Sequence, residues 1–341
     1  MKNGVFTVSL DLELYWGVFD SKSLKDYERN ILGAKEAVEE ILKIFDLYGI
    51  HATWGVVGFV YFENFEELKE NIPPLIPSYK DKRYSTYEKL KEFEKMDKRL
   101  FFAPDTIKKI AETPYQEIAS HTFSHYYCLE EGQGEREFYY DILYSKKIAK
   151  KKINRDLKSI IFPRDQLNIK YIPILKKLGI ESYRGNPSHI IYDPVNQKRK
   201  QNYLRKALLF LDTYVNISGL HAHEIDVFSP IVNIPSSRFL RPVSKRFFYL
   251  ERMRFERIRK QMEFAAREKK VFHLWWHPHN FGVNLRENLA FLKEILIYFK
   301  EMNYKYSMLS LNISEAGDFA KKYVNEKGRE NEKSKWVCGL Q

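Results

Sequence analysis

The sequence predicts an α/β fold built on a parallel sheet. Residues 5–10 (VFTVSL) have the β-branched, apolar character of a strand, and residues 50–57 (IHATWGVV) form a second strand-like run. Between them, residues 30–48 have the apolar spacing of an amphipathic helix that stops at Gly49. Strand, helix and strand in this order form a βαβ unit, whose strands are parallel and whose crossover is right-handed.

The same alternation continues along the rest of the chain. We expect further strands at residues 117–120, 159–163, 180–183, 271–276 and 304–309. We expect further helices at 106–112, 136–151, 165–178, 247–269 and 285–299, and one last helix after the final strand. Residues 73–103 and 185–245 do not show this alternation of strands and helices, so we interpret them as insertions in a single domain of residues 1–320. Residues 325–341 are polar and predict a loose tail.

Composition limits the class of protein. The chain has 341 residues, of which 44% are hydrophobic and 15% aromatic, as in a folded globular protein. No run approaches the roughly 18 apolar residues of a membrane-spanning helix, and the N-terminal apolar run is too short for a signal peptide. Only Cys128 and Cys338 occur, which does not make a disulfide framework. These features predict a cytoplasmic protein.

The formal net charge of +12 indicates an acidic partner, a solvated basic surface, or both. Much of the excess lies on a predicted helix face, as at residues 146–152. No nucleic-acid-binding motif accompanies the basic residues, so we do not expect nucleic acid as a partner. A smaller share of the charge suits a phosphate-bearing substrate, or peripheral contact with the anionic inner face of the membrane.

Polar segments follow several of the apolar runs, at the positions where an α/β sheet or barrel presents its reactive side chains. Asp11 and Glu13 lie two residues apart, so on a strand both side chains point the same way and repel each other unless a cation or a proton separates them. His121 and His125 are four apart and offer nitrogen ligands suited to zinc. A metal held by these histidines and Glu13 would leave Asp11 free to deprotonate water. Taken alone, the histidine pair also fits two ordinary histidines.

Together, the motifs resemble those of the polysaccharide deacetylases of carbohydrate esterase family 4, the NodB-homology superfamily, over roughly residues 4–315. Residues 9–13 (SLDLE) are similar to the first motif, an acidic base followed by an acidic metal ligand, although here one residue separates the two acids. Residues 120–125 (SHTFSH) match the motif that supplies two histidine ligands. Residues 162–166 (FPRDQ) lie where an arginine orients the base, and residues 273–279 (HLWWHPH) resemble the motif with the general acid.

The resemblance implies a distorted (β/α) barrel with insertions that binds one divalent metal ion, zinc in the first place and cobalt or nickel as alternatives. The implied metal ligands are Glu13, His121 and His125. Asp11 would be the catalytic base, Arg164 would orient it, and His277 would be the general acid.

The implied activity is removal of an N-acetyl group from an amino sugar, in a nucleotide- or lipid-linked intermediate of surface polysaccharide biosynthesis. We expect four residues to contact the substrate: Arg184, Arg238, Trp276 and His279. Arg184 follows a strand, and Arg238 lies in a loop-like region where its fork suits phosphate or carboxylate. The alternatives are a deformylase or cyclic-amide hydrolase of the same superfamily, and a carbohydrate-binding protein with this fold but without activity.

Overall fold

The computed structural model describes residues 1–200, 202–227 and 229–338. Its centre is a nine-stranded sheet in the order β6-β5-β4-β3-β2-β1-β8-β7, with β9 paired to the start of β1, and all these pairings are parallel. The strands are β1 (Val5–Leu12), β2 (Ala52–Val56), β3 (Gln116–Ser120), β4 (Ser159–Ile161), β5 (Ser182–Arg184), β6 (Val232–Asn233), β7 (Arg238–Phe239), β8 (Val271–Trp276) and β9 (Leu309–Ser310). The two end strands, β6 and β7, are joined only by residues 234–237, so the sheet curls into a distorted (β/α) barrel, as the sequence predicts.

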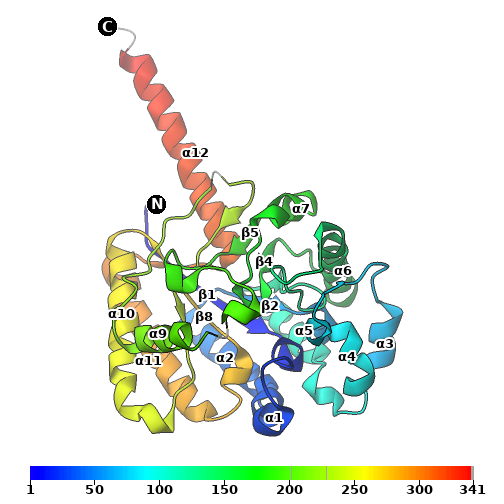
Figure 1. Cartoon of the computed structure of the whole chain (residues 1–341). Coiled ribbons are helices and arrows are strands. Elements are labelled where there is room, and N and C mark those ends of the chain that lie inside the picture. The colour runs from blue at the N-terminus through cyan, green and yellow to red at the C-terminus, as the bar shows by residue number, and fades with distance from the viewer. Residues whose placement is uncertain (201, 228, 339–341) are drawn as a thin grey trace.

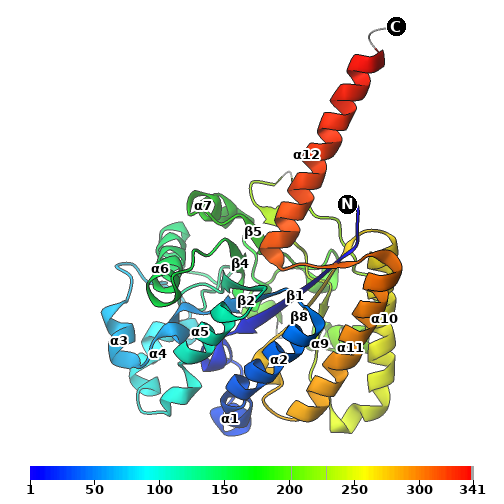
Figure 2. The same ribbon diagram turned by 180° about the vertical axis from the view of Figure 1, so that it is seen from behind.

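Helices surround this sheet (Figures 1 and 2). They are α1 (Leu24–Leu32), α2 (Ala34–Tyr48), α3 (Phe65–Glu70), α4 (Thr86–Phe93), α5 (Pro104–Glu112), α6 (Glu135–Ile153), α7 (Ile172–Lys177), α8 (Gln197–Lys200), α9 (Tyr203–Tyr214), α10 (Glu251–Arg267), α11 (Leu285–Tyr306) and α12 (Ile313–Cys338). In the part of the chain that the structure describes, no helix combines the length and apolar character needed to cross a bilayer.

The two faces of β1 explain why the site lies inside the barrel. All eight residues of the strand are buried, and alternate side chains point to opposite faces. Phe6 packs outward against Phe299 of α11, with ring centroids 4.9 Å apart. Ser9 and Asp11 point inward, where both accept hydrogen bonds from Arg184. The polar side chains of the strands therefore converge in the interior.

Several expected elements differ in detail. The expected strand at 304–309 is wrong for its first residues, because α11 continues to Tyr306 and β9 is only Leu309–Ser310. The region 185–245 contains β6, β7 and α9, which the sequence did not reveal; the two strands are too short to give an alternating pattern. The helix α12 does not end near residue 325 but continues to Cys338, through a segment rich in the helix formers Glu and Lys. Residues 339–341 of the expected tail lie outside the described residues.

Candidate metal centre and its cleft

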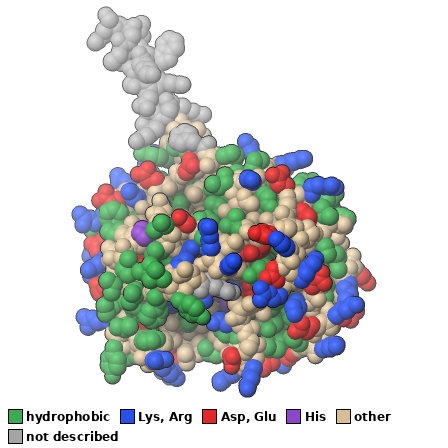
Figure 3. Space-filling view, in the orientation of Figure 1, with side chains coloured by type: hydrophobic (Ala, Val, Ile, Leu, Met, Phe, Trp, Pro, Cys, Tyr) green, Lys and Arg blue, Asp and Glu red, His purple; other side chains and the backbone are tan. Residues whose placement is uncertain are grey.

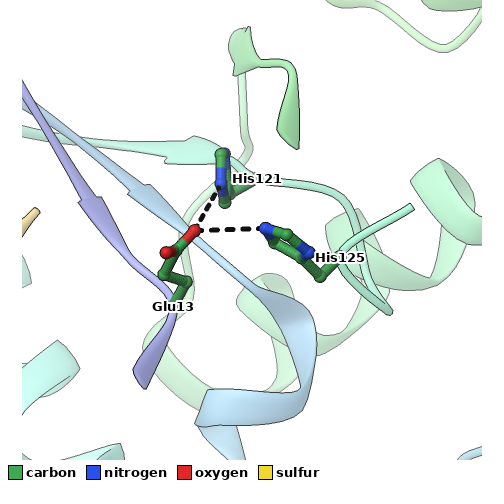
Figure 4. A group of neighbouring side chains, drawn as sticks. All are labelled: Glu13, His121 and His125. Carbon is green, nitrogen blue, oxygen red and sulfur yellow. Dashed lines mark hydrogen bonds and ion pairs between the residues drawn. The ribbon is translucent and has the colours of Figure 1, made fainter. Parts of the chain in front are cut away.

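Three side chains from separate segments point toward one another at the carboxyl ends of the strands (Figure 4). Glu13 follows β1, His121 follows β3, and His125 lies in the loop after β3. The Glu13 Oε2 atom is 3.3 Å from His121 Nε2 and 3.1 Å from His125 Nε2. One ligand atom from each residue lies within 4.8 Å of the others, and all three residues are buried. The structure thus brings together the three metal ligands that the sequence proposed.

The orientation and charge of these groups fit a divalent cation. His121 Nδ1 lies 2.9 Å from the Ile161 carbonyl, to which it donates its N–H, so Nε2 is the ring nitrogen that faces Glu13. A backbone carbonyl in this position fixes the ring in the way typical of metal-binding histidines. Burial lowers the pKa of His125, which favours its neutral form. Burial raises the pKa of Glu13, but the nearby histidines, His277 first among them, outweigh it and hold this pKa well below its usual value. A carboxylate and two imidazole nitrogens form a donor set that suits zinc, cobalt or nickel.

A buried acid holds the loop that carries the two histidines. Asp141 of α6 accepts hydrogen bonds from the backbone N–H of Phe123 (2.5 Å), the backbone N–H of Ser124 (3.1 Å) and the Ser124 hydroxyl (2.5 Å). The same loop places Thr122 and His125 at φ values of 63° and 57°, a left-handed conformation that costs non-glycine residues about 1 kcal/mol or more. Asp141 offsets this cost through its hydrogen bonds. Burial raises its pKa to about 6.

Gly17 makes room for the Glu13 carboxylate. It ends the short 3-10 helix η1 (Leu14–Gly17), which directly follows Glu13. A Cβ atom at position 17 would lie 1.9 Å from Glu13 Cδ and 2.3 Å from each carboxylate oxygen. Only glycine therefore leaves the carboxylate in its observed place. No local pattern in the sequence indicates this requirement or the role of Asp141.

Asp11 lies beside the three candidate ligands and pairs with an arginine. The Arg184 guanidinium donates to both Asp11 carboxylate oxygens, at 2.7 and 2.8 Å. It also donates to Ser9 Oγ at 3.0 Å, and that hydroxyl lies 2.8 Å from His273 Nε2. Burial raises the pKa of Asp11, but Arg184, with His121 and His277, more than offsets burial, so the pKa lies below its usual value. Asp11 is therefore a carboxylate at neutral pH.

The expectation that Arg164 orients Asp11 is wrong in its geometry. Arg164 lies in a turn after β4 at φ 57°, and its guanidinium contacts the Asp20 carboxylate and the Ser21 hydroxyl. Arg184 is the last residue of β5, whereas Arg164 lies three residues after the end of β4, and it is the arginine of β5 that contacts Asp11. Arg184, which we expected to bind substrate, occupies the orienting position.

His277 faces the two acids from β8. Its Nε2 atom lies 3.5 Å from Glu13 Oε1 and 3.8 Å from Asp11 Oδ2, and 21% of its side chain is exposed. Its Nδ1 atom lies 3.3 Å from the Asn280 side-chain oxygen, and its ring stacks on His279 with centroids 4.9 Å apart. His279 itself is buried and lines the cavity, and its predicted contact with substrate stays a prediction. His277 is thus placed to exchange a proton with a group held beside Asp11.

The expectation that Trp276 contacts substrate is wrong. Trp276 is fully buried and packs against Phe45 and Phe281, because alternate residues of β8 point to opposite faces. Trp275 shares the inward face with His277 and lines the cavity. The Arg184 guanidinium lies 4.1 Å from the Trp275 ring centroid, which is a cation–π contact.

A cavity of about 330 Å³ opens beside Asp11, Glu13 and His277. Arg238 is part of its wall, but its donors are occupied by Gln261 (2.5 Å) and by the backbone and carboxylate oxygens of Asp212 (3.0 and 3.2 Å). The expected role of Arg238 in phosphate binding is therefore not supported, since its donors already have buried partners, one of which is the Asp212 carboxylate that it shares with Arg257.

Arg241 also lines this cavity, and it differs from Arg238 in its partners. Its Nε–H donates to the Thr213 hydroxyl at 2.9 Å, and its guanidinium lies over the rings of Phe210 and Phe239. Among the described residues, no carboxylate lies within 4 Å of it. Within the part of the chain that the structure describes, this half-buried cation in the cavity wall therefore has no acidic partner within 4 Å.

Comparison with known proteins agrees with this architecture. A family model described as polysaccharide deacetylase matches residues 19–183. A putative polysaccharide deacetylase from Mycobacterium smegmatis is 13% identical, with 94% of this chain and 92% of that chain covered and a TM-score of 0.60. A probable polysaccharide deacetylase from Pseudomonas aeruginosa PAO1 is 11% identical, with 95% and 92% covered and a TM-score of 0.54. A GH57-type branching enzyme from the hyperthermophilic archaeon Pyrococcus horikoshii is 12% identical, with 92% and 69% covered and a TM-score of 0.52.

At these identities the solved structures establish a shared fold and nothing more. No curated protein sequence matches this chain significantly. The family match covers the two histidines of the candidate metal centre but neither Asp11 and Glu13 nor His277.

Proposed function

We propose that this chain, which matches a polysaccharide deacetylase family model over residues 19–183, is a metal-dependent hydrolase that removes an N-acetyl group from an amino sugar. The observation that carries the proposal is the convergence of Glu13, His121 and His125 beside an ionised Asp11, with His277 across the same cavity. Amide hydrolysis needs a base for water, an acid for the departing amine and a site for developing negative charge. This arrangement offers all three.

Glu13, His121 and His125 would hold the divalent cation, which we propose to be zinc, with cobalt or nickel as alternatives. A bound divalent cation polarises a carbonyl oxygen and lowers the pKa of water toward about 7. The remaining steps depend on the protein's own side chains.

Asp11 acts as the base in this proposal. Arg184 holds both of its oxygens and keeps it ionised, so it can take a proton from a water molecule as the water oxygen adds to the acetyl carbon. The bidentate contact also limits rotation of the carboxylate, which keeps the accepting oxygen in one place.

His277 acts as the acid. When the carbon–nitrogen bond breaks, the amine nitrogen receives a proton from His277, and acetate and a free amino sugar are formed. The ring is held by Asn280 and by stacking on His279, and it is exposed enough on the cavity side to regain its proton from solvent. Trp275 and His279 form the wall beside these groups, and the Arg184 guanidinium lies over the Trp275 ring.

The lining of the cavity supports a phosphate-bearing amino sugar. Trp275 and Phe239 offer ring surfaces for a sugar, and Arg241 offers a guanidinium without an acidic partner among the described residues. Guanidinium forks suit phosphate oxygens. A nucleotide- or lipid-linked sugar of surface polysaccharide biosynthesis has this combination of features, and a lipid-linked one would require peripheral contact with the membrane.

The test is release of acetate from N-acetylated amino sugars by the purified, zinc-loaded protein. Asp11→Asn should abolish acetate release and leave zinc binding intact, because Asp11 is not among the proposed ligands. Release of formate or of a ring-opened acid in place of acetate would assign a different amide substrate. A wild-type protein that binds sugar and hydrolyses none of these amides would contradict the proposal.

A further inference from the structure

The helix α9 has an apolar stripe on the side that faces away from the cavity. The stripe consists of residues at helical spacing along α9 and just beyond its end: Leu204, Leu208, Leu211 and Val215. Leu204 exposes 70% of its surface and Leu211 exposes 48%. The opposite side of the helix lines the cavity, through Arg205, Leu209 and Thr213. A single helix therefore separates the candidate active site from an exposed apolar surface.

The short helix η8 (Lys245–Leu250) extends this surface. Phe248 exposes 66% of its surface and Tyr249 exposes 91%. Phe247 of η8 contacts Phe210 of α9, with ring centroids 5.5 Å apart, so the two elements lie side by side. We define the α9–η8 face by its exposed apolar residues: Tyr203, Leu204, Leu211, Val215, Phe248, Tyr249 and Met253. Figure 3 shows it as a broad hydrophobic area on the left, over α9 and the start of α10.

The exposed charged residues within the two segments that form this face are all basic. Residues 202–217 and 244–253 contain two acids, Asp212 and Glu251, and both are buried and paired with arginines. The exposed charged residues of these two segments are basic: Lys206, Lys245, Arg246 and Arg252. Among the described residues, only Lys245 of these four has a carboxylate within 4 Å, that of Glu287 at 3.9 Å. The face is thus apolar with a basic rim.

We propose that the α9–η8 face binds the surface of an anionic lipid bilayer. Exposed aromatic and leucine side chains with lysine and arginine around them are the pattern of surfaces that insert into the headgroup region. Each basic residue near an anionic bilayer adds to the attraction. A second copy of the chain is a poorer occupant, because a two-fold contact through this face would bring the basic rim against itself.

Membrane docking extends the proposed function, and it rests on that function only for the identity of the substrate. Since α9 lies between the face and the cavity, docking would hold the cavity close to the lipid headgroups. The substrate would then be an amino sugar attached through phosphate to a membrane lipid, with Arg241 beside the phosphate. The docking itself can be tested without any substrate.

The experiment is co-sedimentation of the full-length protein with vesicles. One set of vesicles contains phosphatidylglycerol and phosphatidylcholine in equal parts, and the other contains phosphatidylcholine alone. The test variant is Leu204→Glu with Tyr249→Glu. The matched control is Leu47→Glu with Tyr304→Glu, on α2 and α11, where the exposed fractions are 74% and 90%. Both variants make the same change in composition and net charge at exposed positions.

We expect the wild-type protein to bind the anionic vesicles and not the neutral ones, with binding that weakens as salt is added. The test variant should partition into anionic vesicles about tenfold less than the wild type, and the control variant should bind as the wild type does. Equal loss in both variants, or no binding to anionic vesicles at all, would overturn the proposal. A dimer that becomes a monomer in the test variant, with no vesicle binding in either protein, would assign the face to a second copy instead.

Acetate release from a water-soluble N-acetylated sugar, measured on the same proteins, separates the two proposals. Asp11→Asn should lose that activity and keep its vesicle binding. Vesicle binding without any hydrolysis would count against the proposed function alone.

Discussion

The Arg184 guanidinium donates a hydrogen bond to each carboxylate oxygen of Asp11, at 2.7 and 2.8 Å. Both side chains are almost completely buried. A buried carboxylate without such a partner would be driven toward its protonated form. The contact with Arg184 therefore explains how the buried Asp11 side chain can remain an ionised carboxylate at neutral pH.

Replacing Arg184 should move the acid side of the pH–rate profile. Arg184→Gln removes the cation that lowers the pKa of Asp11, so this pKa should rise and activity should require a higher pH. We expect kcat/KM near neutral pH to fall by about a hundredfold or more. Arg184→Lys should recover part of the loss. Arg164 contacts Asp20 and not Asp11, so Arg164→Gln should leave the acid side of the pH–rate profile unchanged. A shift of that side in Arg164→Gln and not in Arg184→Gln would contradict the assignment of Arg184 as the partner of Asp11.

Gly17→Ala should weaken metal binding without unfolding the protein. The new methyl group would displace the Glu13 carboxylate, the one acidic group among the three candidate ligands. We expect zinc affinity to fall by about tenfold or more, measured by competition with a chelating dye. Gly317→Ala is the control, because a Cβ there would meet its nearest neighbours at an ordinary 3.5 Å. Unchanged zinc affinity in Gly17→Ala would show that Glu13 is not a ligand.

Asp141→Asn should loosen the loop that carries the two histidines. The amide NH₂ cannot accept a hydrogen bond, so at least one donor among the Phe123 N–H, the Ser124 N–H and the Ser124 hydroxyl would lose its partner. The free energy of unfolding should fall by about 1–3 kcal/mol, measured by urea denaturation. Zinc added to the variant should restore part of this loss, because a bound metal stabilises the folded state.

Buried histidines should make the protein sensitive to acid. Burial lowers the pKa of His273 and of His279 to about 3, whereas an unfolded histidine titrates near 6.5. Between these values the unfolded chain binds more protons than the folded one, so stability should fall as the pH is lowered from about 6.5. Each histidine should contribute a slope of about 1.4 kcal/mol per pH unit. Urea denaturation of the metal-free protein at several pH values measures this slope, and a flat profile would contradict it.

The sequence predicted those site residues that lie at the ends of strands and at a regular separation from one another. Asp11 and Glu13 share a face of one strand, and His121 and His125 lie four apart after another, so their convergence could be anticipated. The inward direction of Trp275 could also have been read from the strand, since His273, Trp275 and His277 alternate with the outward residues. Choosing Trp276 overlooked that alternation.

Other parts depend on three-dimensional packing that no local pattern encodes. Arg164 lies just after one short strand and Arg184 at the end of another, and only the curl of the sheet decides which of them reaches Asp11. Gly17 and Asp141 act through a missing Cβ and through hydrogen bonds to a distant loop. The hydrophobic pattern of residues 185–245 did not indicate a helix, because α9 exposes apolar residues that a helix in a globular protein would ordinarily bury.

The decisive measurement is anomalous X-ray scattering at the zinc absorption edge from crystals of the full-length protein grown with zinc. We predict one peak between Glu13 Oε2, His121 Nε2 and His125 Nε2, at about 2.0–2.2 Å from each. The peak should be lost in Glu13→Ala crystals grown in the same way. A wild-type map without density at this position, or a zinc ion bound elsewhere that Glu13→Ala leaves in place, would contradict the metal site and the hydrolytic chemistry built on it.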